Sequence, residues 1–366
     1  MYEKFGQFID GKWQQSSSGE TYEVINPATE EIIGKASKAN SKDVQRALKS
    51  AEKGLEIWRN TSPWERSKVI RRISELMRQK VDTLSKWLTL EVGKPLSEGP
   101  GEVGGAADIF EWNSEETKRI FGEINQSRFP NTKIHVIYQP VGVVAALIPW
   151  NFPVILASRK ISTALAAGCS VIVKPDVITP GSVMEIVNIC KEAGVPPGVV
   201  NLLSGDPAAI SSELIQSDII KKISITGSTR VGKLILKQAA DKVQRVTMEL
   251  SGHSPFIVFE DVDLNTRHSR QIDDVDSPSG KRTQRSVWKR HTFIDASGSS
   301  SAGIVSAQGS RLSSGKPLSG VNHATDTPKS VILKGGGGGG NWMARSSKSS
   351  KAMRKKQQSK LTDSYA

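Results

Sequence analysis

Four residues with useful chemistry each stand at the end of an apolar segment of strand length: Asn151, Lys174, Gly227 and Glu249. The segments are rich in β-branched residues, and stretches with helical periodicity separate them, which predicts the strands of a parallel sheet. Ligands bind at the carboxyl ends of parallel strands. We therefore expect these four residues to surround one cleft.

Asn151 and Glu249 have side chains that suit catalysis. Asn151 lies in the turn Pro-Trp-Asn-Phe-Pro, residues 149–153, where its amide could donate a hydrogen bond to a developing oxyanion. Glu249 ends an apolar strand beside the small residues Ser251 and Gly252, so we expect it to be buried and to act as a general base. The alternatives are an ordinary turn at Asn151 and a salt-bridged strand end at Glu249.

Lys174 and Gly227 suit a nucleotide ligand. An ammonium group directly after the strand at residues 171–173 could bind ribose hydroxyls or a phosphate; the alternative is a solvated surface lysine. Residues 227–232 join a strand to a helix, so Gly227 permits close backbone approach and the helix N-terminus favours an anion such as a pyrophosphate. The Gly-x-x-x-x-Gly spacing differs from the usual Gly-x-Gly-x-x-Gly of dinucleotide sites.

The elements that must position these residues fall into two parts. Before residue 140 the sequence predicts a β-hairpin, three helices and a strand, at residues 9–13, 41–59, 62–91, 103–120 and 133–139. From Val141 to the strand at residues 255–259, strands alternate with helices. This alternation predicts an α/β protein with a doubly wound, Rossmann-like parallel sheet.

Residues 266–366 have a different composition. They hold 18 Lys and Arg residues against 6 Asp, a charge of +12 out of the chain's +13, which leaves +1 for residues 1–265. Glu260 is the last glutamate, and Ser, Gly, Lys and Arg dominate the residues after it. This composition predicts disorder, and the run Gly335–Gly340 matches a dinucleotide motif only because any polyglycine does.

Cysteine, histidine and hydropathy argue against several classes of protein. Cys169 and Cys190 are the chain's two cysteines, and the five histidines have no ligand-like spacing, so we expect neither a disulfide framework nor a metal site. The N-terminus lacks a basic and apolar leader, and no segment approaches about 18 consecutive apolar residues. We expect a cytoplasmic protein with no membrane partner.

Four motifs, in this order and spacing, resemble those of the aldehyde dehydrogenase superfamily: residues 149–153, residues 174–175, residues 227–229 with Gly232, and residues 249–252. The resemblance covers about residues 5–265. Further segments bring the chain closest to the succinate-semialdehyde dehydrogenase group, namely residues 91–96, 110–112, 119–122 and 158–160.

In that family a cysteine thiolate attacks the aldehyde, a hydride passes to NAD or NADP, and water hydrolyses the thioester. The resemblance implies that Asn151 is the oxyanion donor, Glu249 the base and Arg159 the ligand of a substrate carboxylate. Val177 stands where NAD-preferring members often have a glutamate, which leaves NADP admissible. The resemblance also implies cofactor contacts from Ile148, Pro149, Trp150, Lys174, Gly205, Gly227 and Ser228.

The chain also departs from the family. The catalytic cysteine of the family follows the base by roughly 30 to 35 residues, but this chain has no cysteine after Cys190. Ser251 replaces a glycine, a small change that we expect to crowd the site. The resemblance ends near Leu264, close to the last glutamate, so we predict a shifted reading frame and a fold truncated before the catalytic domain.

These observations predict three regions and a function. The regions are the N-terminal helical and β-arm part of the cofactor-binding domain (1–140), a Rossmann-like NAD(P)-binding domain (141–265) and a low-complexity basic tail (266–366). The expected function is NAD(P)-dependent oxidation of an aldehyde, a semialdehyde by resemblance, in a chain that lacks the nucleophile. The alternatives are an NAD(P)-binding protein without catalysis and a nonspecific nucleic-acid binder that uses the tail. We favour a small aldehyde over nucleic acid as the partner, and we expect that this chain does not form the family's homo-oligomer.

Overall fold

The structure of the chain is a computed structural model that describes residues 2–252. The strand predicted at residues 255–259 and the tail at residues 266–366, with its polyglycine run, lie outside the described residues. Residues 2–250 belong to a single compact unit. The domain boundary predicted at residue 140 stays a prediction.

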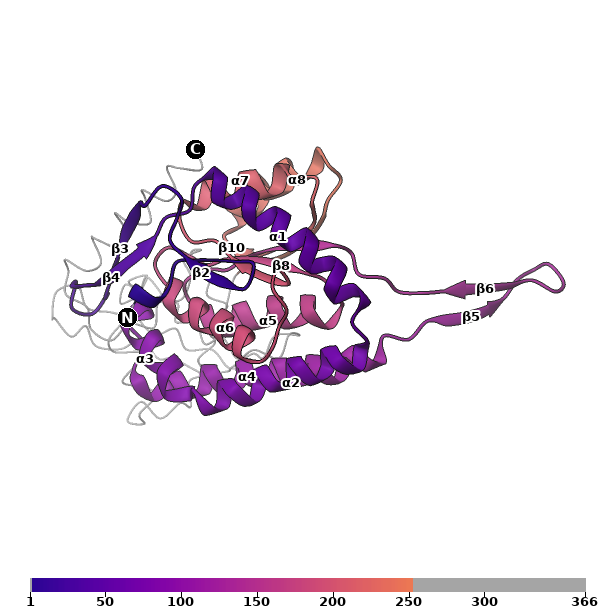
Figure 1. Cartoon of the computed structure of the whole chain (residues 1–366), viewed down its shortest axis with the longest axis horizontal. Coiled ribbons are helices and arrows are strands. Elements are labelled where there is room, and N and C mark those ends of the chain that lie inside the picture. Colours follow the sequence, from indigo (N-terminus) through magenta and orange to yellow (C-terminus); the bar gives the residue numbers. More distant parts are fainter. Residues whose placement is uncertain (1, 253–366) are drawn as a thin grey trace, which may run out of the picture. The chain divides into compact units, whose positions relative to one another are not determined.

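A sheet of seven strands forms the centre of this unit (Figure 1). The strand order is β11-β10-β7-β8-β9-β1-β2. Strands β7 to β11 pair in parallel, and β1 pairs antiparallel with both β9 and β2. The strands are β1 (Gln7–Ile9), β2 (Lys12–Gln14), β7 (Val143–Leu147), β8 (Val171–Lys174), β9 (Val200–Leu202), β10 (Ile220–Gly227) and β11 (Arg245–Leu250).

Helices cover both faces of the sheet, which confirms the predicted doubly wound arrangement. In Figure 1, α5 and α6 lie below the sheet, and α1, α7 and α8 lie above it. Every residue of β7 and β8 is buried, because a strand covered on both faces has no side exposed to water. The helices below are α5 (Pro153–Ala166) and α6 (Pro180–Glu192), and those above are α1 (Ser41–Asn60), α7 (Pro207–Gln216) and α8 (Thr229–Ala240).

Three more helices form an outer layer against α5 and α6: α2 (Pro63–Gln79), α3 (Val81–Val92) and α4 (Gly99–Glu116). Ser62 caps α2 as predicted, with its Oγ accepting a hydrogen bond from Glu65 N at 3.3 Å. The prediction of a single helix from residue 62 to residue 91 is wrong, because the chain turns at Lys80. Lys80 N donates to both Leu76 O and Met77 O, so α2 closes there and α3 packs separately on α6.

Smaller elements complete the described residues. The hairpin predicted at residues 9–13 is confirmed as β1 and β2. The helix predicted at residues 103–120 begins earlier, at Gly99, and ends at Glu116, where a 3₁₀ turn follows. The strand predicted at residues 133–139 is shorter, because it ends at Val136. The remaining elements are β3 (Thr21–Ile25), β4 (Ile32–Ser37), β5 (Glu123–Gln126), β6 (Lys133–Val136), and the 3₁₀ turns η1 (Tyr2–Lys4), η2 (Leu96–Glu98) and η3 (Thr117–Arg119).

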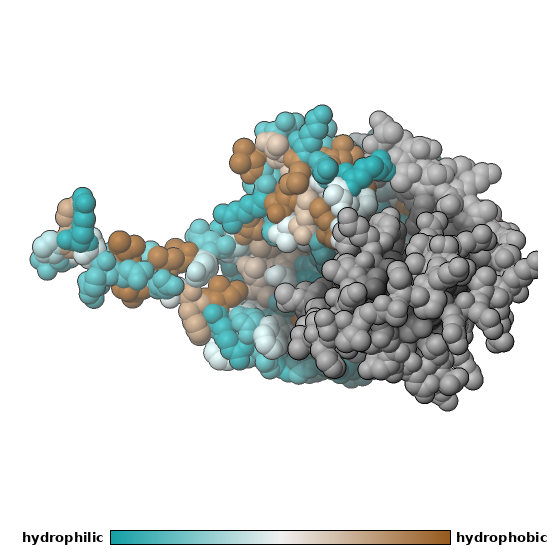
Figure 2. All heavy atoms as spheres, turned by 180° about the vertical axis from the view of Figure 1, so that it is seen from behind, coloured by the Kyte–Doolittle hydropathy of each residue, from teal (hydrophilic) through white to brown (hydrophobic). Residues whose placement is uncertain are grey.

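The hairpin of β5 and β6 differs from the rest of the described structure, because it projects away from the sheet and helices (Figure 1). Its apolar side chains appear as brown patches along the projection in Figure 2. Ile124 is 66% exposed and Ile134 51% exposed. The hairpin contributes no side chain to either of the two buried apolar clusters.

Among the helices at residues 2–252, none has a segment that is both long and apolar enough to cross a membrane.

Candidate functional site

The carboxyl ends of the parallel strands meet along one edge of the sheet. Leu147 at the end of β7 lies opposite both Lys174 of β8 and Ile225 of β10. Thr226, the next residue of β10, lies opposite Glu249 of β11. The structure thus brings the predicted strand ends to one edge, with β10 between β7 and β11. That Asn151 and Glu249 lie within about 15 Å of each other, as reach to a common substrate atom requires, stays a prediction.

Asn151 lies in the turn that connects β7 to α5. Its Oδ1 is buried and has no hydrogen-bond partner among the described residues. A buried amide oxygen without a partner costs about 1–3 kcal/mol. Ile148, at the start of the same turn, donates its N–H to Lys174 O at 3.0 Å and so ties the turn to β8.

A buried ion pair fixes the other end of this turn. Lys94 and Glu102 bond to each other, and Glu102 Oε1 accepts hydrogen bonds from Val154 N at 3.0 Å and Ile155 N at 3.2 Å. Lys94 Nζ also lies 3.4 Å from the centre of the Phe152 ring. Glu102 therefore caps the N-terminus of α5, directly after Asn151.

This ion pair was missed by the sequence analysis. Burial raises the pKa of the Glu102 carboxyl, and the ammonium of Lys94 and the two N–H groups oppose that effect. No clear signal was present in the sequence, because the helix predicted at residues 103–120 begins after Glu102, whereas in the structure Glu102 lies in the first turn of α4.

Lys174 is enclosed, since only 5% of its surface is exposed. The alternative of a solvated surface lysine is therefore wrong. Burial lowers the pKa of Lys174 to about 8, although the carboxylates of Asp176 and Asp206 act in the opposite direction. The residue is a cation held in a central position of the sheet.

The turn at residues 227–232 leads from β10 into α8. Ser228 is the N-cap, and its Oγ accepts a hydrogen bond from Val231 N at 3.3 Å. A Cβ atom at Gly232 would lie 2.7 Å from the side chain of Leu250, so this glycine allows α8 to pack closely on β11. Gly205 has φ +147°, and a Cβ there would lie 2.9 Å from Ala39 N.

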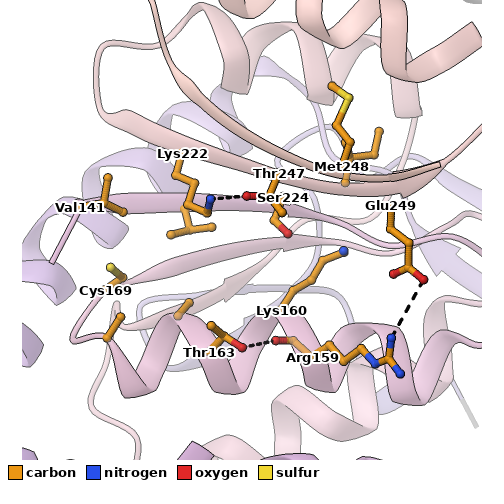
Figure 3. Close-up of a pocket in the computed structure, with 14 residues that line it drawn as sticks. Val141, Arg159, Lys160, Thr163, Cys169, Lys222, Ser224, Thr247, Met248 and Glu249 are labelled. Atoms are coloured by element: carbon orange, nitrogen blue, oxygen red, sulfur yellow. Dashed lines mark hydrogen bonds and ion pairs between the residues drawn. The ribbon is translucent and has the colours of Figure 1, made fainter. Parts of the chain in front are cut away.

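Glu249 is not buried, contrary to the prediction. Its side chain retains 53% of its surface, because β11 is the outermost strand of the described sheet. Arg159 of α5 faces it, with Nη1 4.0 Å from Glu249 Oε1, as the dashed line in Figure 3 shows. Glu249, the expected base, and Arg159, which is expected to bind a substrate carboxylate, are therefore neighbours.

Thr226 and Lys160 connect to the same carboxylate, and neither was assigned a role from the sequence. Lys160 Nζ donates to Thr226 Oγ1 at 2.8 Å, and Thr226 Oγ1 donates to Glu249 Oε2 at 3.4 Å. Burial lowers the pKa of Lys160 to about 8 in spite of the nearby Glu249 carboxylate. A lysine inside the apolar stretch that forms α5 was the signal that could have identified it.

Arg159, Lys160 and Glu249 line a cavity of about 390 Å³ between α5 and the strands β7, β10 and β11 (Figure 3). Cys169 also lines it, but at the end opposite Glu249. Lys222, whose charge acts on Cys169, precedes Thr226 by four residues of β10, or about 13 Å along a strand. Cys169 therefore lies far from Glu249, which is opposite Thr226. Burial raises the pKa of the Cys169 thiol, and it raises that of Cys190, which is enclosed in α6, to about 12.

Comparison with known sequences gives the same family as the motifs in the sequence. Residues 13–282 match the model of the Aldehyde dehydrogenase family, somewhat beyond the end near residue 265 that the motifs indicate. The chain is 41% identical over 258 residues to a glutarate-semialdehyde dehydrogenase of Pseudomonas putida, covering 70% of this chain and 54% of the relative. It is 39% identical over 257 residues to a succinate-semialdehyde dehydrogenase [NADP(+)] of Escherichia coli, covering 70% and 53%. The chain spans about half the length of these curated relatives.

Comparison with solved structures finds the same family. A crystal structure of succinate-semialdehyde dehydrogenase from Burkholderia pseudomallei superposes with a TM-score of 0.69 and 42% sequence identity. The superposition covers 71% of this chain and 54% of that chain.

Proposed function

Because the chain belongs to the aldehyde dehydrogenase family, we propose that residues 2–252 carry most of a site for NAD(P)-dependent oxidation of an aldehyde to a carboxylate. The observation that carries this proposal is the row of strand ends along one edge of the sheet. Asn151, Lys174, Thr226 and Glu249 follow or end four adjacent strands there. A nucleotide and an aldehyde could both reach that edge.

The residues present fit a dinucleotide. Lys174 offers an enclosed ammonium to ribose hydroxyls. Gly205, after β9, has no side chain, so the backbone there can lie close to Ala39. Ser228 begins a helix of 12 residues, whose N-terminal dipole favours a negative pyrophosphate. The nicotinamide of a bound cofactor would supply the hydride acceptor.

An aldehyde that carries its own carboxylate fits the outer end of this edge. Arg159 presents a guanidinium to the cavity, and its partner Glu249 is 4.0 Å away and more than half exposed. A substrate carboxylate could therefore take a bidentate hold on Arg159 in place of a loose ion pair. The names of the semialdehyde dehydrogenases that the chain resembles are consistent with this class of substrate.

The chemistry that these residues can perform follows from their atoms. The amide Nδ2 of Asn151 can donate a hydrogen bond to an oxyanion, and the carboxylate of Glu249 can accept a proton from water. Thr226 holds Glu249 from one side, with Lys160 behind it. Both functions assist an attacking nucleophile and cannot replace it.

The nucleophile is the missing part of the proposed site. At the spacing that the resemblance implies, the family's cysteine would fall at about residues 279–284, which contain none. Cys169 lies at the far end of the cavity, and burial raises its pKa, so its thiolate is disfavoured. We therefore propose that this chain binds the cofactor but does not oxidise aldehydes.

Two assays test this function. Isothermal titration with NAD+ and NADP+ should show binding, whereas absorbance of reduced nicotinamide should not increase when succinate semialdehyde is added. The Escherichia coli relative is the positive control for the second assay. Sustained oxidation by this chain, abolished by Cys169→Ala or Cys190→Ala, would show that the nucleophile has been misplaced.

A further inference from the structure

Strand β10 has a polar face that the neighbouring strands β7 and β8 lack. In β7 and β8 every residue is buried, and the side chains that pack toward α5 are apolar. On the same face β10 presents Lys222, Ser224 and Thr226, whereas Ile223 and Ile225 pack on the opposite face. Parallel strands with a neighbour on each side are mostly apolar on both faces, so this polar face calls for an explanation.

The polar face of β10 is one wall of the cavity that α5 closes from the other side (Figure 3). One end of this cavity holds Arg159 and Glu249, where we place the aldehyde. At the opposite end Lys222 lies directly across from Val144 of β7, about 13 Å along β10 from Thr226. We call this part of the cavity the Lys222 end. Its apolar lining is formed by Val141, Val144, Ala164, Ala167 and Cys169.

Lys222 brings a positive charge to this end without an acid to balance it. Its Nζ donates a hydrogen bond to Thr247 Oγ1, which is a neutral partner. Within the described residues no carboxylate forms an ion pair with this ammonium. Thr247 also lines the cavity, so the ammonium and the hydroxyl are both available to a ligand.

A second cation without an acid lies beside this end. Arg66 of α2 retains 7% of its surface, and its Nε has no hydrogen-bond partner among residues 2–252. Its Nη1 donates to Thr61 O at 2.7 Å and would be 3.2 Å from a Cβ atom on Gly168, the residue before Cys169. No carboxylate in the described part of the chain pairs with this guanidinium. Two positive charges therefore flank the Lys222 end.

A site of this composition favours an anion that has an apolar part. A cation beside apolar surface is poorly hydrated, so it gains more from an anion there than it would in water. The apolar lining gains from contact with an aliphatic chain, because water is removed from both surfaces. The cavity volume of about 390 Å³ is near the lower limit for ligand sites, which hold about 300–1,000 Å³, so the ligand is small.

We propose that the Lys222 end binds a small amphipathic anion, a carboxylate with an aliphatic chain of medium length. The carboxylate accepts hydrogen bonds from the Lys222 ammonium and the Thr247 hydroxyl. The chain lies against Val144 and Ala167, between β7 and α5. This site is separate from the proposed sites for the cofactor and the aldehyde, and it does not depend on either.

Isothermal titration of the full chain with octanoate, without cofactor or aldehyde, tests this inference. We expect one octanoate to bind per chain with a dissociation constant of about 1 mM or lower, which is within reach of a ligand of this size. Octanol has the chain without the charge, and acetate has the charge without the chain. Each should bind at least about tenfold more weakly than octanoate, because each keeps one part of the interaction and loses the other.

Two variants locate the carboxylate and the chain. Lys222→Met removes the ammonium and keeps much of the side-chain volume, so the affinity for octanoate should fall about tenfold while that for octanol stays within about twofold. Ala167→Phe places a ring in the apolar part of the cavity and should weaken the binding of both ligands. Ala167 is the C-cap of α5 and is partly exposed, so the helix accommodates the larger side chain.

Two controls match the removal of charge at Lys222. Lys221 precedes it in β10 but is exposed and is not part of the cavity lining, so Lys221→Met should leave the affinity for octanoate within about twofold. Arg159→Met removes a cation from the opposite end of the same cavity and should also leave that affinity within about twofold.

The outcomes separate this inference from the proposed function. Absence of octanoate binding by the unaltered chain, or equal affinities for octanoate and octanol, would overturn the inference. A greater loss in Arg159→Met than in Lys222→Met would also overturn it, because the carboxylate would then lie at the aldehyde end. None of these results bears on the cofactor site, and failure of NAD+ to bind would not bear on the Lys222 end. Circular dichroism of each variant establishes that it is folded before its affinities are compared.

Discussion

Lys174 and Glu249 each end an apolar strand at the same edge of the sheet, but their surroundings differ. Lys174 retains 5% of its surface and belongs to β8, which has β7 and β9 on its two sides. The side chain of Glu249 retains 53% and belongs to β11, the outermost strand of the described sheet. The place of a strand in the sheet therefore decides whether a charge at its end is enclosed.

The same contrast extends to the neighbouring groups. We call Lys174 and the N-termini of α5 and α6 the enclosed part of the edge, and Thr226 with Glu249 the outer part. In the enclosed part, Glu102 and Glu91 are buried and accept backbone N–H groups that begin α5 and α6. In the outer part, Glu249 is held by side chains at 3.4 Å and 4.0 Å. We expect charge changes to be costly in the enclosed part and tolerated in the outer part.

The largest effect should come from breaking the ion pair of Lys94 and Glu102. Glu102→Ala leaves the Lys94 ammonium buried without its partner and two N–H groups of α5 without an acceptor. Removing one partner of a buried pair costs about 3–5 kcal/mol. Urea unfolding followed by tryptophan fluorescence measures this loss.

Glu111→Ala, on the exposed side of the same helix, is the control for that variant. Glu111 bonds only to arginines that are themselves solvated, so its loss should be far smaller. Equal losses for the two variants would remove the distinction between buried and solvated charges.

A second effect should appear in the dependence of stability on pH. Burial raises the pKa of Glu91 to about 7, although Tyr2 and the N–H groups of Gly181 and Ser182 oppose this. Between about pH 4.5 and 7 the folded state holds a proton that the unfolded state releases, so stability falls as pH rises. Relative to Glu91→Gln, the unaltered chain should lose up to about 3 kcal/mol across this window.

Unfolding curves recorded at pH 5 and pH 8 for both proteins give this difference. Glu91→Gln cannot titrate at this position, so it supplies the baseline for the other carboxylates. The same difference between the two proteins at both pH values would show that Glu91 ionises as readily in the folded as in the unfolded state.

The third effect concerns cofactor binding. Lys174→Met removes a buried charge and keeps much of the side-chain volume. Because Asp176 and Asp206 lose the cation that acts on them, we expect a loss of stability, so an unfolding curve first establishes that the variant is folded. Affinity for NAD+ should fall about tenfold, the value of one charge-assisted hydrogen bond. Since the pKa of Lys174 is about 8, the affinity of the unaltered chain should also weaken above that pH, and that of the variant should not.

The smallest effect is expected at the outer part of the edge. Glu249→Gln should change the free energy of unfolding by less than about 0.5 kcal/mol, because the side chain is more than half exposed. It should also leave the affinity for NAD+ within about twofold of the unaltered chain. A loss as large as that from Glu102→Ala would mean that Glu249 is enclosed in solution.

Local signals in the sequence were enough for much of the architecture. The hairpin at residues 9–13 and the cap at Ser62 are set by neighbouring residues, and both were predicted. The alternation of strands and helices after Val141 also predicted the doubly wound sheet. These features depend on periodicity and on turn and cap chemistry, which act over a few residues.

The break at Lys80 and the role of Glu102 could not be predicted in the same way. Lys80 ends one helix and precedes the next without a proline or glycine to mark it, since what matters there is the packing of α3 on α6. Glu102 acts on Val154 and Ile155, more than fifty residues later in the chain. Contacts at such separation exist only once the helices have packed.

The sequence by itself determined which residues stand at the ends of the parallel strands, because each apolar segment stops at a recognisable residue such as Lys174 or Glu249. Only the tertiary structure decided which of these two charges is enclosed. The local sequences of the two segments are alike, but in the part of the chain that the structure describes one is a central strand and the other is the outermost. Burial depends on what packs against both sides and both faces of a strand, and distant parts of the chain supply that packing.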